Sequence, residues 1–281
     1  MLDQTQQRTC KSASARSLVM NGALVAIALT FLFALFGSTA HAQSMHVGVR
    51  CQDSFQDSWA PDIDIYPACS DFISQISSTD TVDFYFNLEN AAPAFESGNA
   101  NETCNSCGGT DSVDFFFMIT HGTIANNNAN YAGYAMWNDN SIAWTPTMRF
   151  GDSGKDLKVF ATFSCDTFKT SDGLFWNRWQ TVFDGGLKIG VGGHDLLYVD
   201  NSTTAVTDFA ANMQSGQSIG ESWLESVWDA NNDNHPSVAN TGANSSQCWS
   251  RQGATLSSVQ TMSTLRDSQI GYVCWSGWNG D

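Results

Sequence analysis

Two apolar runs constrain the fold of this chain most strongly, because one leads to a histidine and the other to a cysteine. Residues 115–119 lead through a threonine into His121, and residues 157–163 lead through a serine into Cys165. Apolar runs of about four to eight residues are typical of strands that are buried on both faces of a parallel sheet. Ligands bind just past the carboxyl ends of such strands. We therefore expect His121 and Cys165 to face each other at one edge of a sheet.

The rest of the chain alternates between predicted strands and predicted helices. We expect further strands at 45–51, 82–88, 187–191 and 270–275, helices at 70–77, 174–183, 204–214 and 218–230, and a hairpin within 131–144. This alternation is typical of βαβ units and indicates an α/β fold with a parallel sheet. Residues 231–264 are mostly polar, and we expect them to be irregular.

The first 42 residues have the three-part pattern of a secretory signal peptide. A polar start with three basic residues precedes an apolar stretch at 17–37, and small residues at Ala40 and Ala42 match the positions that a signal peptidase reads. The alternative is a retained membrane anchor, because the apolar stretch approaches spanning length. Cleavage after Ala42 predicts a secreted or periplasmic protein with no membrane attachment. The remaining residues, 43–281, are enough for a single α/β domain.

The charge and the cysteines narrow the class of protein further. The net charge of −16 at pH 7 argues against a nucleic-acid or anionic-membrane partner. Of eight cysteines, Cys10 leaves with the leader, so an odd number remains in an oxidising compartment, where cysteines tend to pair. We expect Cys165 to be the free one, a bridge to join Cys248 to Cys274, and Cys104 and Cys107 to form structural disulfides.

A free cysteine beside a histidine has a specific chemistry. A thiol is a poor nucleophile until it loses its proton, and a nearby imidazole can accept that proton. Backbone amides near Gly122 and Cys165 would stabilise a developing oxyanion, and Gly122 lets a substrate approach the backbone. The alternative is a histidine at the end of a strand and an unrelated, inert core cysteine.

The two runs with their His-Gly and Ser-Cys endings, residues 115–122 and 159–165, resemble the caspase-type peptidases, which include gingipains, clostripain and legumain. The chain is more narrowly similar to a family of secreted bacterial proteins of unassigned function with this fold. Supporting stretches lie at 111–114, 149–152, 156–157 and 183–187, and the resemblance covers roughly residues 45–230.

This resemblance implies a caspase-like three-layer sandwich, in which a mostly parallel sheet of about six strands has helices on both faces. It implies a catalytic dyad of His121 and Cys165, an oxyanion site that includes the Gly122 amide, and a peptide or protein substrate. Separately from the resemblance, we expect that no cofactor is required. The strand after the nucleophile borders the specificity pocket in such folds. We therefore predict that His194 and Asp195 line or support that pocket, and that Asp166 favours a basic substrate side chain.

Two other functions remain open. A secreted binding domain with the same fold would need no chemistry at Cys165. A carbohydrate-binding protein would use exposed members of the ten tryptophans, of which Trp137 and Trp144 are close in sequence to His121.

Calcium is the one metal that the sequence suggests. Asp229, Asn231 and Asp233 follow a predicted helix with the spacing of a calcium loop, but position twelve is Asn240 rather than a glutamate. The alternative is a solvated polar turn.

Overall fold

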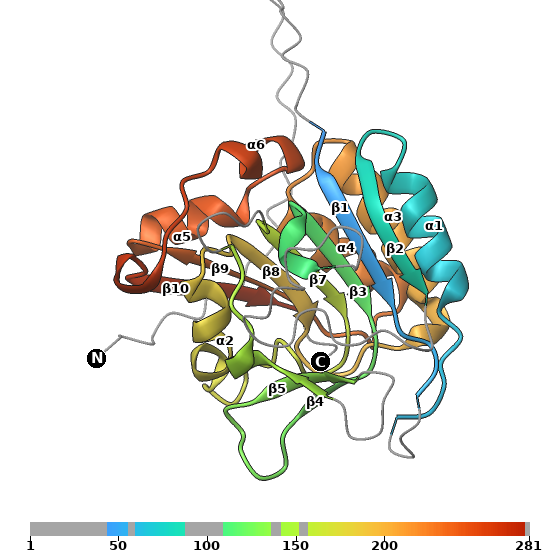
Figure 1. The fold of residues 1–281 in the computed structure, drawn as a ribbon, viewed down its shortest axis with the longest axis horizontal. Coiled ribbons are helices and arrows are strands. Elements are labelled where there is room, and N and C mark those ends of the chain that lie inside the picture. The colour runs from blue at the N-terminus through green and yellow to red at the C-terminus, as the bar shows by residue number, and fades with distance from the viewer. Residues whose placement is uncertain (1–43, 56–59, 88–108, 136–141, 152–156, 279–281) are drawn as a thin grey trace, which may run out of the picture. The chain divides into compact units, whose positions relative to one another are not determined.

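A seven-stranded sheet in the order β10-β9-β8-β7-β3-β1-β2 is the centre of the computed structural model (Figure 1). The structure describes residues 44–55, 60–87, 109–135, 142–151 and 157–278, and these belong to one compact unit. The sheet strands are β1 His46–Cys51, β2 Thr81–Asn87, β3 Phe115–Ile119, β7 Val159–Phe163, β8 Ile189–Gly193, β9 Pro236–Gly242 and β10 Tyr272–Gly277.

Six α-helices accompany the sheet in the described part of the chain. They are α1 Tyr66–Ile76, α2 Phe175–Asp184, α3 Ser202–Gln214, α4 Ile219–Ala230, α5 Ser245–Gln252 and α6 Leu256–Thr261. Helix α1 begins four residues before the predicted start at Ser70. Pro67 sits in its first turn, where a missing backbone N–H costs nothing.

The sheet is mostly parallel. Strands β2, β1, β3, β7 and β8 pair in parallel, whereas β9 and β10 are antiparallel to their neighbours. All residues of β3, β7 and β8 are buried, as expected for strands covered on both faces. The predicted α/β class with a mostly parallel central sheet is confirmed.

Two apolar clusters lie on opposite faces of this sheet, and β3 divides its side chains between them. Phe115, Phe117 and Ile119 join the cluster that includes residues of α1, α3 and α4. Phe116 and Met118 join the other cluster, which includes residues of α2 and of β5 and β6. The alternation follows from the two-residue period of a strand, and it gives the sheet helices on both faces.

A smaller antiparallel sheet follows β3 and contains the predicted hairpin. It consists of β4 Gly122–Ile124, β5 Ala132–Ala135 and β6 Ile142–Trp144, in the order β4-β5-β6. Figure 1 shows β4 and β5 below the lower ends of β3 and β7. The turn predicted at 138–140 lies outside the described residues. The small sheet therefore begins directly at the His121–Gly122 step.

The prediction of an irregular segment at 231–264 is wrong, because β9, α5 and α6 lie there. Their sequences carry few apolar residues, so neither a helical nor a strand pattern stands out. Helix α5 buries only Cys248 and Arg251, and α6 buries only Val259. Side-chain caps mark both starts instead: Asn244 accepts a bond from the Gln247 amide, and Thr255 forms a capping box with Ser258.

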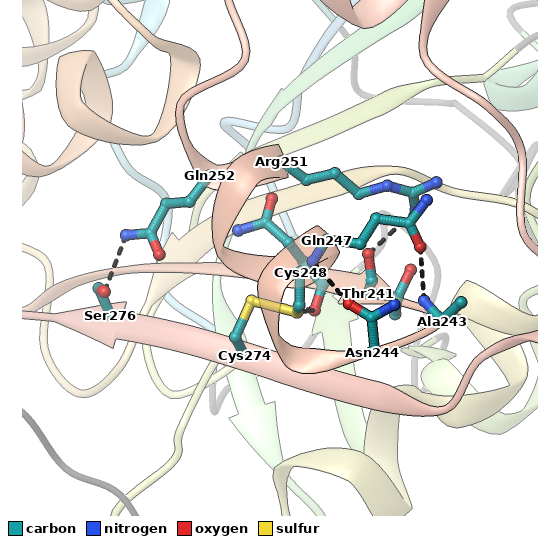
Figure 2. Close-up of a disulfide and its surroundings, with 10 residues drawn as sticks. Thr241, Ala243, Asn244, Gln247, Cys248, Arg251, Gln252, Cys274 and Ser276 are labelled. Atoms are coloured by element: carbon teal, nitrogen blue, oxygen red, sulfur yellow. Dashed lines mark hydrogen bonds between the residues drawn. A yellow bond between two sulfur atoms is a disulfide. The ribbon is translucent and has the colours of Figure 1, made fainter.

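Among the described residues, two disulfides connect the sheet to its helices. Cys51, the last residue of β1, is bonded to Cys69 in α1, and Cys248 in α5 is bonded to Cys274 in β10 (Figure 2). The predicted Cys248–Cys274 bridge is thus confirmed. Cys165 is the free cysteine among the described residues, as predicted. Cys104 and Cys107 lie outside the described residues, as does the predicted signal peptide at 1–42. No helix in the described ranges is long and apolar enough to cross a membrane.

Candidate functional site

The register of β3 and β7 brings His121 and Cys165 to neighbouring positions. Ile119 pairs with Phe163 at the carboxyl ends of these parallel strands, and His121 and Cys165 each follow two residues later. Ile119, Phe163 and Cys165 all contribute to the cluster on the face of α1, α3 and α4. The structure therefore brings the two predicted residues to the same edge of the sheet.

Gly122 is in close contact with the backbone of Cys165. A Cβ atom at position 122 would overlap the Cys165 carbonyl oxygen, so only glycine fits here. The Ala135 amide donates to the His121 carbonyl at 2.9 Å, which makes these two residues a hydrogen-bonded pair of the β4–β5 ladder. Because such pairs alternate, Gly122 and Tyr134 form a non-hydrogen-bonded pair. The β4–β5 ladder therefore does not use the Gly122 amide.

The imidazole of His121 contacts the loop that follows β1. Its Nε2 atom lies 2.8 Å from the carbonyl oxygen of Pro61, and its ring centroid lies 5.0 Å from that of Phe55. A carbonyl oxygen can only accept a hydrogen bond, so Nε2 must carry the proton. In a neutral ring, Nδ1 is then the atom that can accept a proton.

The thiol of Cys165 contacts the backbone of Leu197. The Leu197 amide donates to Sγ at 3.4 Å, and Sγ lies 3.6 Å from the Leu197 carbonyl oxygen. Burial raises the pKa of the Cys165 thiol, the Leu197 amide opposes the rise, and the carboxylates of Asp166 and Asp195 add to it. The thiol is therefore neutral at rest. No hydrogen bond joins it to the His121 ring in the described part of the structure.

Asp166 and Asp195 frame the cysteine from two loops. The Asp166 amide donates to the Asp195 carbonyl at 2.9 Å, and the Asp166 carboxylate pairs with Lys169 at 3.0 Å. The Asp195 carboxylate lies 3.8 Å from Nδ1 of His235 and is about half exposed. Asp166 has a φ of 57°, a left-handed conformation that aspartate tolerates better than most residues. Both carboxylates act on the Cys165 thiol, as their effect on its pKa shows.

His194 is buried behind this edge and is already engaged. Its Nδ1 atom accepts a bond from the Thr170 amide at 3.2 Å, and the Thr170 hydroxyl lies 2.8 Å away. Burial lowers the pKa of His194, so the ring is neutral with its proton on Nε2. Because Nδ1 is occupied, His194 is not available as a base for Cys165. It holds the loop that follows the cysteine.

Phe168 anchors the same loop in the sheet. A Cβ atom at Gly190 or Gly192 of β8 would meet the Phe168 ring, so these two glycines make room for it. The centroid of the Phe168 ring lies 4.1 Å from the centroid of the Trp179 ring. The Phe168 amide donates to the Gly193 carbonyl at 2.8 Å. The segment after the cysteine is therefore firmly attached to β8.

The residues predicted to bind calcium lie at the end of α4 and in the turn that follows it. The side chain of Asn231 accepts a bond from the Asp233 amide at 3.0 Å, as in an Asx turn. Asp229 lies at the end of α4, and Asn240, at position twelve, lies inside β9. These contacts do not support the calcium-loop prediction, which stays a prediction. The described residues contain no group of three or more His, Cys, Asp or Glu side chains arranged to hold a metal ion.

Several residues that contact the site carry no recognisable sequence signal. Phe55, Pro61, Leu197 and Thr170 reach it from three separate loops, mostly through backbone atoms. Because a backbone contact does not depend on residue type, a sequence pattern cannot reveal it. Trp137, proposed above for a carbohydrate surface, lies outside the described residues. Trp144 is partly buried against Tyr131.

Comparisons with known proteins place the chain in a family. A search of curated proteins finds no match. The model of the family described as a domain of unknown function, DUF6345, matches residues 67–271, which include both His121 and Cys165. That match covers well over half of the sequence. The chain belongs to the DUF6345 family.

Proposed function

We propose that this protein is a secreted cysteine hydrolase of caspase-like fold that cleaves peptide or amide bonds with Cys165 and His121. The observation that carries the proposal is the register of β3 and β7. It brings a free thiol and an imidazole to the carboxyl edge of adjacent parallel strands. The mostly parallel sheet with helices on both faces agrees with the fold that the sequence resemblance implies.

The state of His121 supports its role as the base. The Pro61 carbonyl holds the ring with its proton on Nε2, which leaves Nδ1 to receive a proton. A base whose orientation is set by a third group is the usual arrangement around an activated nucleophile. In this proposal, His121 takes the thiol proton as a substrate carbonyl approaches.

The reaction proceeds through an acyl-enzyme. The Cys165 sulfur attacks the carbonyl carbon, its proton passes to His121, and the protonated ring then donates to the leaving amine. Water hydrolyses the resulting thioester with His121 again as base. Because burial raises the pKa of Cys165, the thiolate forms only during this proton transfer and does not persist at rest.

The Gly122 amide is the proposed donor to the oxyanion. It is not used by the β4–β5 ladder, and Gly122 packs directly on the Cys165 backbone. An amide held in this way needs no reorganisation when charge develops on the substrate oxygen. The Cys165 amide, in the segment that follows β7, is the second proposed donor.

A second candidate function is a secreted binding domain with the same fold and no chemistry. Its support is the environment of the thiol, which is bonded to Leu197 and faces two carboxylates instead of a cationic group. Reactive cysteines usually lie in electropositive surroundings. The two functions differ in whether His121 controls the reactivity of Cys165.

The test combines thiol alkylation with substrate screening. The rate at which iodoacetamide modifies Cys165 is measured from pH 5 to pH 10 in the natural protein and in His121→Ala. The hydrolase proposal expects the two pH profiles to differ. A peptide-library screen, with Cys165→Ala as the control, should show cleavage that this variant lacks. Identical alkylation profiles together with no cleavage would support the binding domain instead.

A further inference from the structure

We infer that the buried Cys51–Cys69 disulfide positions His121, so that the site requires one oxidised cysteine pair and one reduced cysteine at the same time. The disulfide acts through the 52–65 loop, whose described residues are 52–55 and 60–65. The inference rests on the proposed function, because it concerns how the base of that site is held.

The disulfide joins the two ends of the 52–65 loop. Cys51 is the last residue of β1 and Cys69 lies in the second turn of α1, with Cα atoms 6.4 Å apart. Both cysteines are fully buried. Next to Cys51, the Gln52 amide donates to the Ile119 carbonyl at 3.0 Å, which brings the start of the loop against the end of β3. The Cys51–Cys69 disulfide therefore closes the 52–65 loop next to the end of β3, which His121 follows.

Hydrogen bonds inside the loop transmit this constraint to the residues that touch His121. The Ile63 amide donates to the Asp53 carbonyl at 2.8 Å, and the Phe55 amide donates to the Asp62 carboxylate at 2.9 Å. Pro61 lies directly beside Asp62. Phe55 and Pro61 therefore belong to a hydrogen-bonded loop whose ends are held together by the disulfide.

The position of the His121 ring depends on this unit. In the described part of the structure, its side-chain hydrogen bond is to the Pro61 carbonyl and its ring contact is with Phe55. Both partners come from the 52–65 loop and neither comes from β3 or β4. If the loop moves, the ring loses the acceptor that fixes its proton on Nε2 and the aromatic surface that fixes its plane.

The two redox states are compatible because the sulfurs differ in access. Cys165 is partly exposed to solvent, whereas Cys51 and Cys69 are both fully buried. Thiol–disulfide exchange requires the attacking thiolate to reach a sulfur atom. A reductant can thus keep Cys165 reduced while the folded protein shields the disulfide that holds His121.

The test compares the two disulfides as matched variants. Cys51→Ala/Cys69→Ala removes the proposed clamp. The control, Cys248→Ala/Cys274→Ala, removes the disulfide between α5 and β10. Its cysteines are 26 residues apart in sequence, against 18 for Cys51 and Cys69, and β10 is an edge strand of the sheet. The readout is the pH profile of Cys165 alkylation, with near-UV circular dichroism to verify that each variant is folded.

We expect the Cys51/Cys69 variant to adopt the profile of His121→Ala, with a loss of alkylation rate near neutral pH on the order of tenfold or more, as for a misplaced base. We expect the Cys248/Cys274 variant to keep the natural profile. If His121→Ala changes the profile but the two disulfide variants behave alike, the inference is overturned and the proposed function stands. If His121→Ala changes nothing, the proposed function is overturned and the inference falls with it.

Two milder variants keep the test decisive if the Cys51/Cys69 variant does not fold. Asp62→Ala removes a bond within the loop at an exposed position, and Phe55→Ala removes the ring contact. Both should shift the alkylation profile in the direction of His121→Ala. Unchanged profiles in both variants would overturn the inference.

Discussion

Gly122 lies so close to Cys165 that a single added carbon atom would overlap the Cys165 carbonyl oxygen. The neighbouring backbone atoms belong to β4 on one side and to the end of β7 on the other. Neither can shift far, because β4 pairs with β5 and β7 pairs with β3 and β8. The spacing between the histidine side and the cysteine side of the site is therefore determined by backbone packing.

Gly122→Ala should separate these two backbones. We expect it to lower the free energy of unfolding by about 1–3 kcal/mol, as for an overpacked site, and to slow alkylation of Cys165 at neutral pH. Urea unfolding and the alkylation assay measure the two effects. Gly253→Ala is the control, because a Cβ there meets nothing closer than 3.6 Å. Equal behaviour of the two variants would contradict the predicted steric conflict.

Two buried asparagines should respond in opposite ways to the same substitution. The side chain of Asn234 is fully used, since it accepts from the Tyr198 amide at 2.7 Å and donates to the Val227 carbonyl at 2.9 Å. Asn240 is equally buried, yet neither amide atom of its side chain has a hydrogen-bond partner. An unpaired buried polar group costs about 1–3 kcal/mol.

We therefore expect Asn240→Val to raise the free energy of unfolding by about 1 kcal/mol or more, and Asn234→Val to lower it by about 2 kcal/mol or more. Denaturant unfolding at a single pH is sufficient to compare the two variants. A loss of stability in Asn240→Val as large as that in Asn234→Val would mean that the Asn240 amide has partners in solution.

Lys188 should make stability depend on pH in the alkaline range. Its Nζ atom donates to the carbonyls of Val259 and Met262 at 3.0 and 2.6 Å, and burial lowers its pKa from 10.5 to about 8. Between these values the unfolded chain binds more protons than the folded protein, so the contribution of this group to the free energy of unfolding rises with pH.

The measurement is the difference in unfolding free energy between the natural protein and Lys188→Met at several values from pH 7 to pH 10. We expect this difference to shift in favour of the natural protein as the pH rises from about 8 towards 10.5. A constant difference over that range would show that the lysine titrates normally in the folded state.

His194 should be a neutral ring with its proton on Nε2. Because burial lowers its pKa below 6.5, its contribution to stability is present above pH 6.5 and is lost as the pH falls through that value to the folded-state pKa. Nitrogen-15 NMR of labelled histidine distinguishes the tautomers and follows the titration. Thr170→Val removes the hydroxyl donor to Nδ1 and should cost about 1 kcal/mol. A ring protonated on Nδ1 at pH 7 would contradict the assignment.

Strands covered on both faces were the most predictable part of the fold. Strands β3, β7 and β8 are apolar runs because both faces are covered, and α3 and α4 show helical spacing because each buries one face. In contrast, β9 contains Pro236, Asn240 and Gly242 and is nevertheless completely buried. Its position depends on β8, β10, α4 and α5, which no local pattern reveals.

The candidate site likewise contains residues that could be predicted from the sequence and residues that could not. His121, Gly122 and Cys165 were predictable because each ends or follows a conspicuous strand. The Pro61 carbonyl and the Leu197 backbone were not, because they reach the site through tertiary packing of loops. The contact of His194 with Thr170 was not predictable either, because it too depends on how a loop packs.

The Phe168 ring, seated over Gly190 and Gly192, limits how the site can change shape when a ligand arrives. Only two residues separate Cys165 from this anchor, so the sulfur cannot travel far without pulling an aromatic ring out of the core. Any adjustment that brings the thiol and the imidazole into contact must therefore come mainly from the histidine. Ligand-induced movement should thus be concentrated around residues 52–55, 60–65 and 121, while residues 164–168 stay in place.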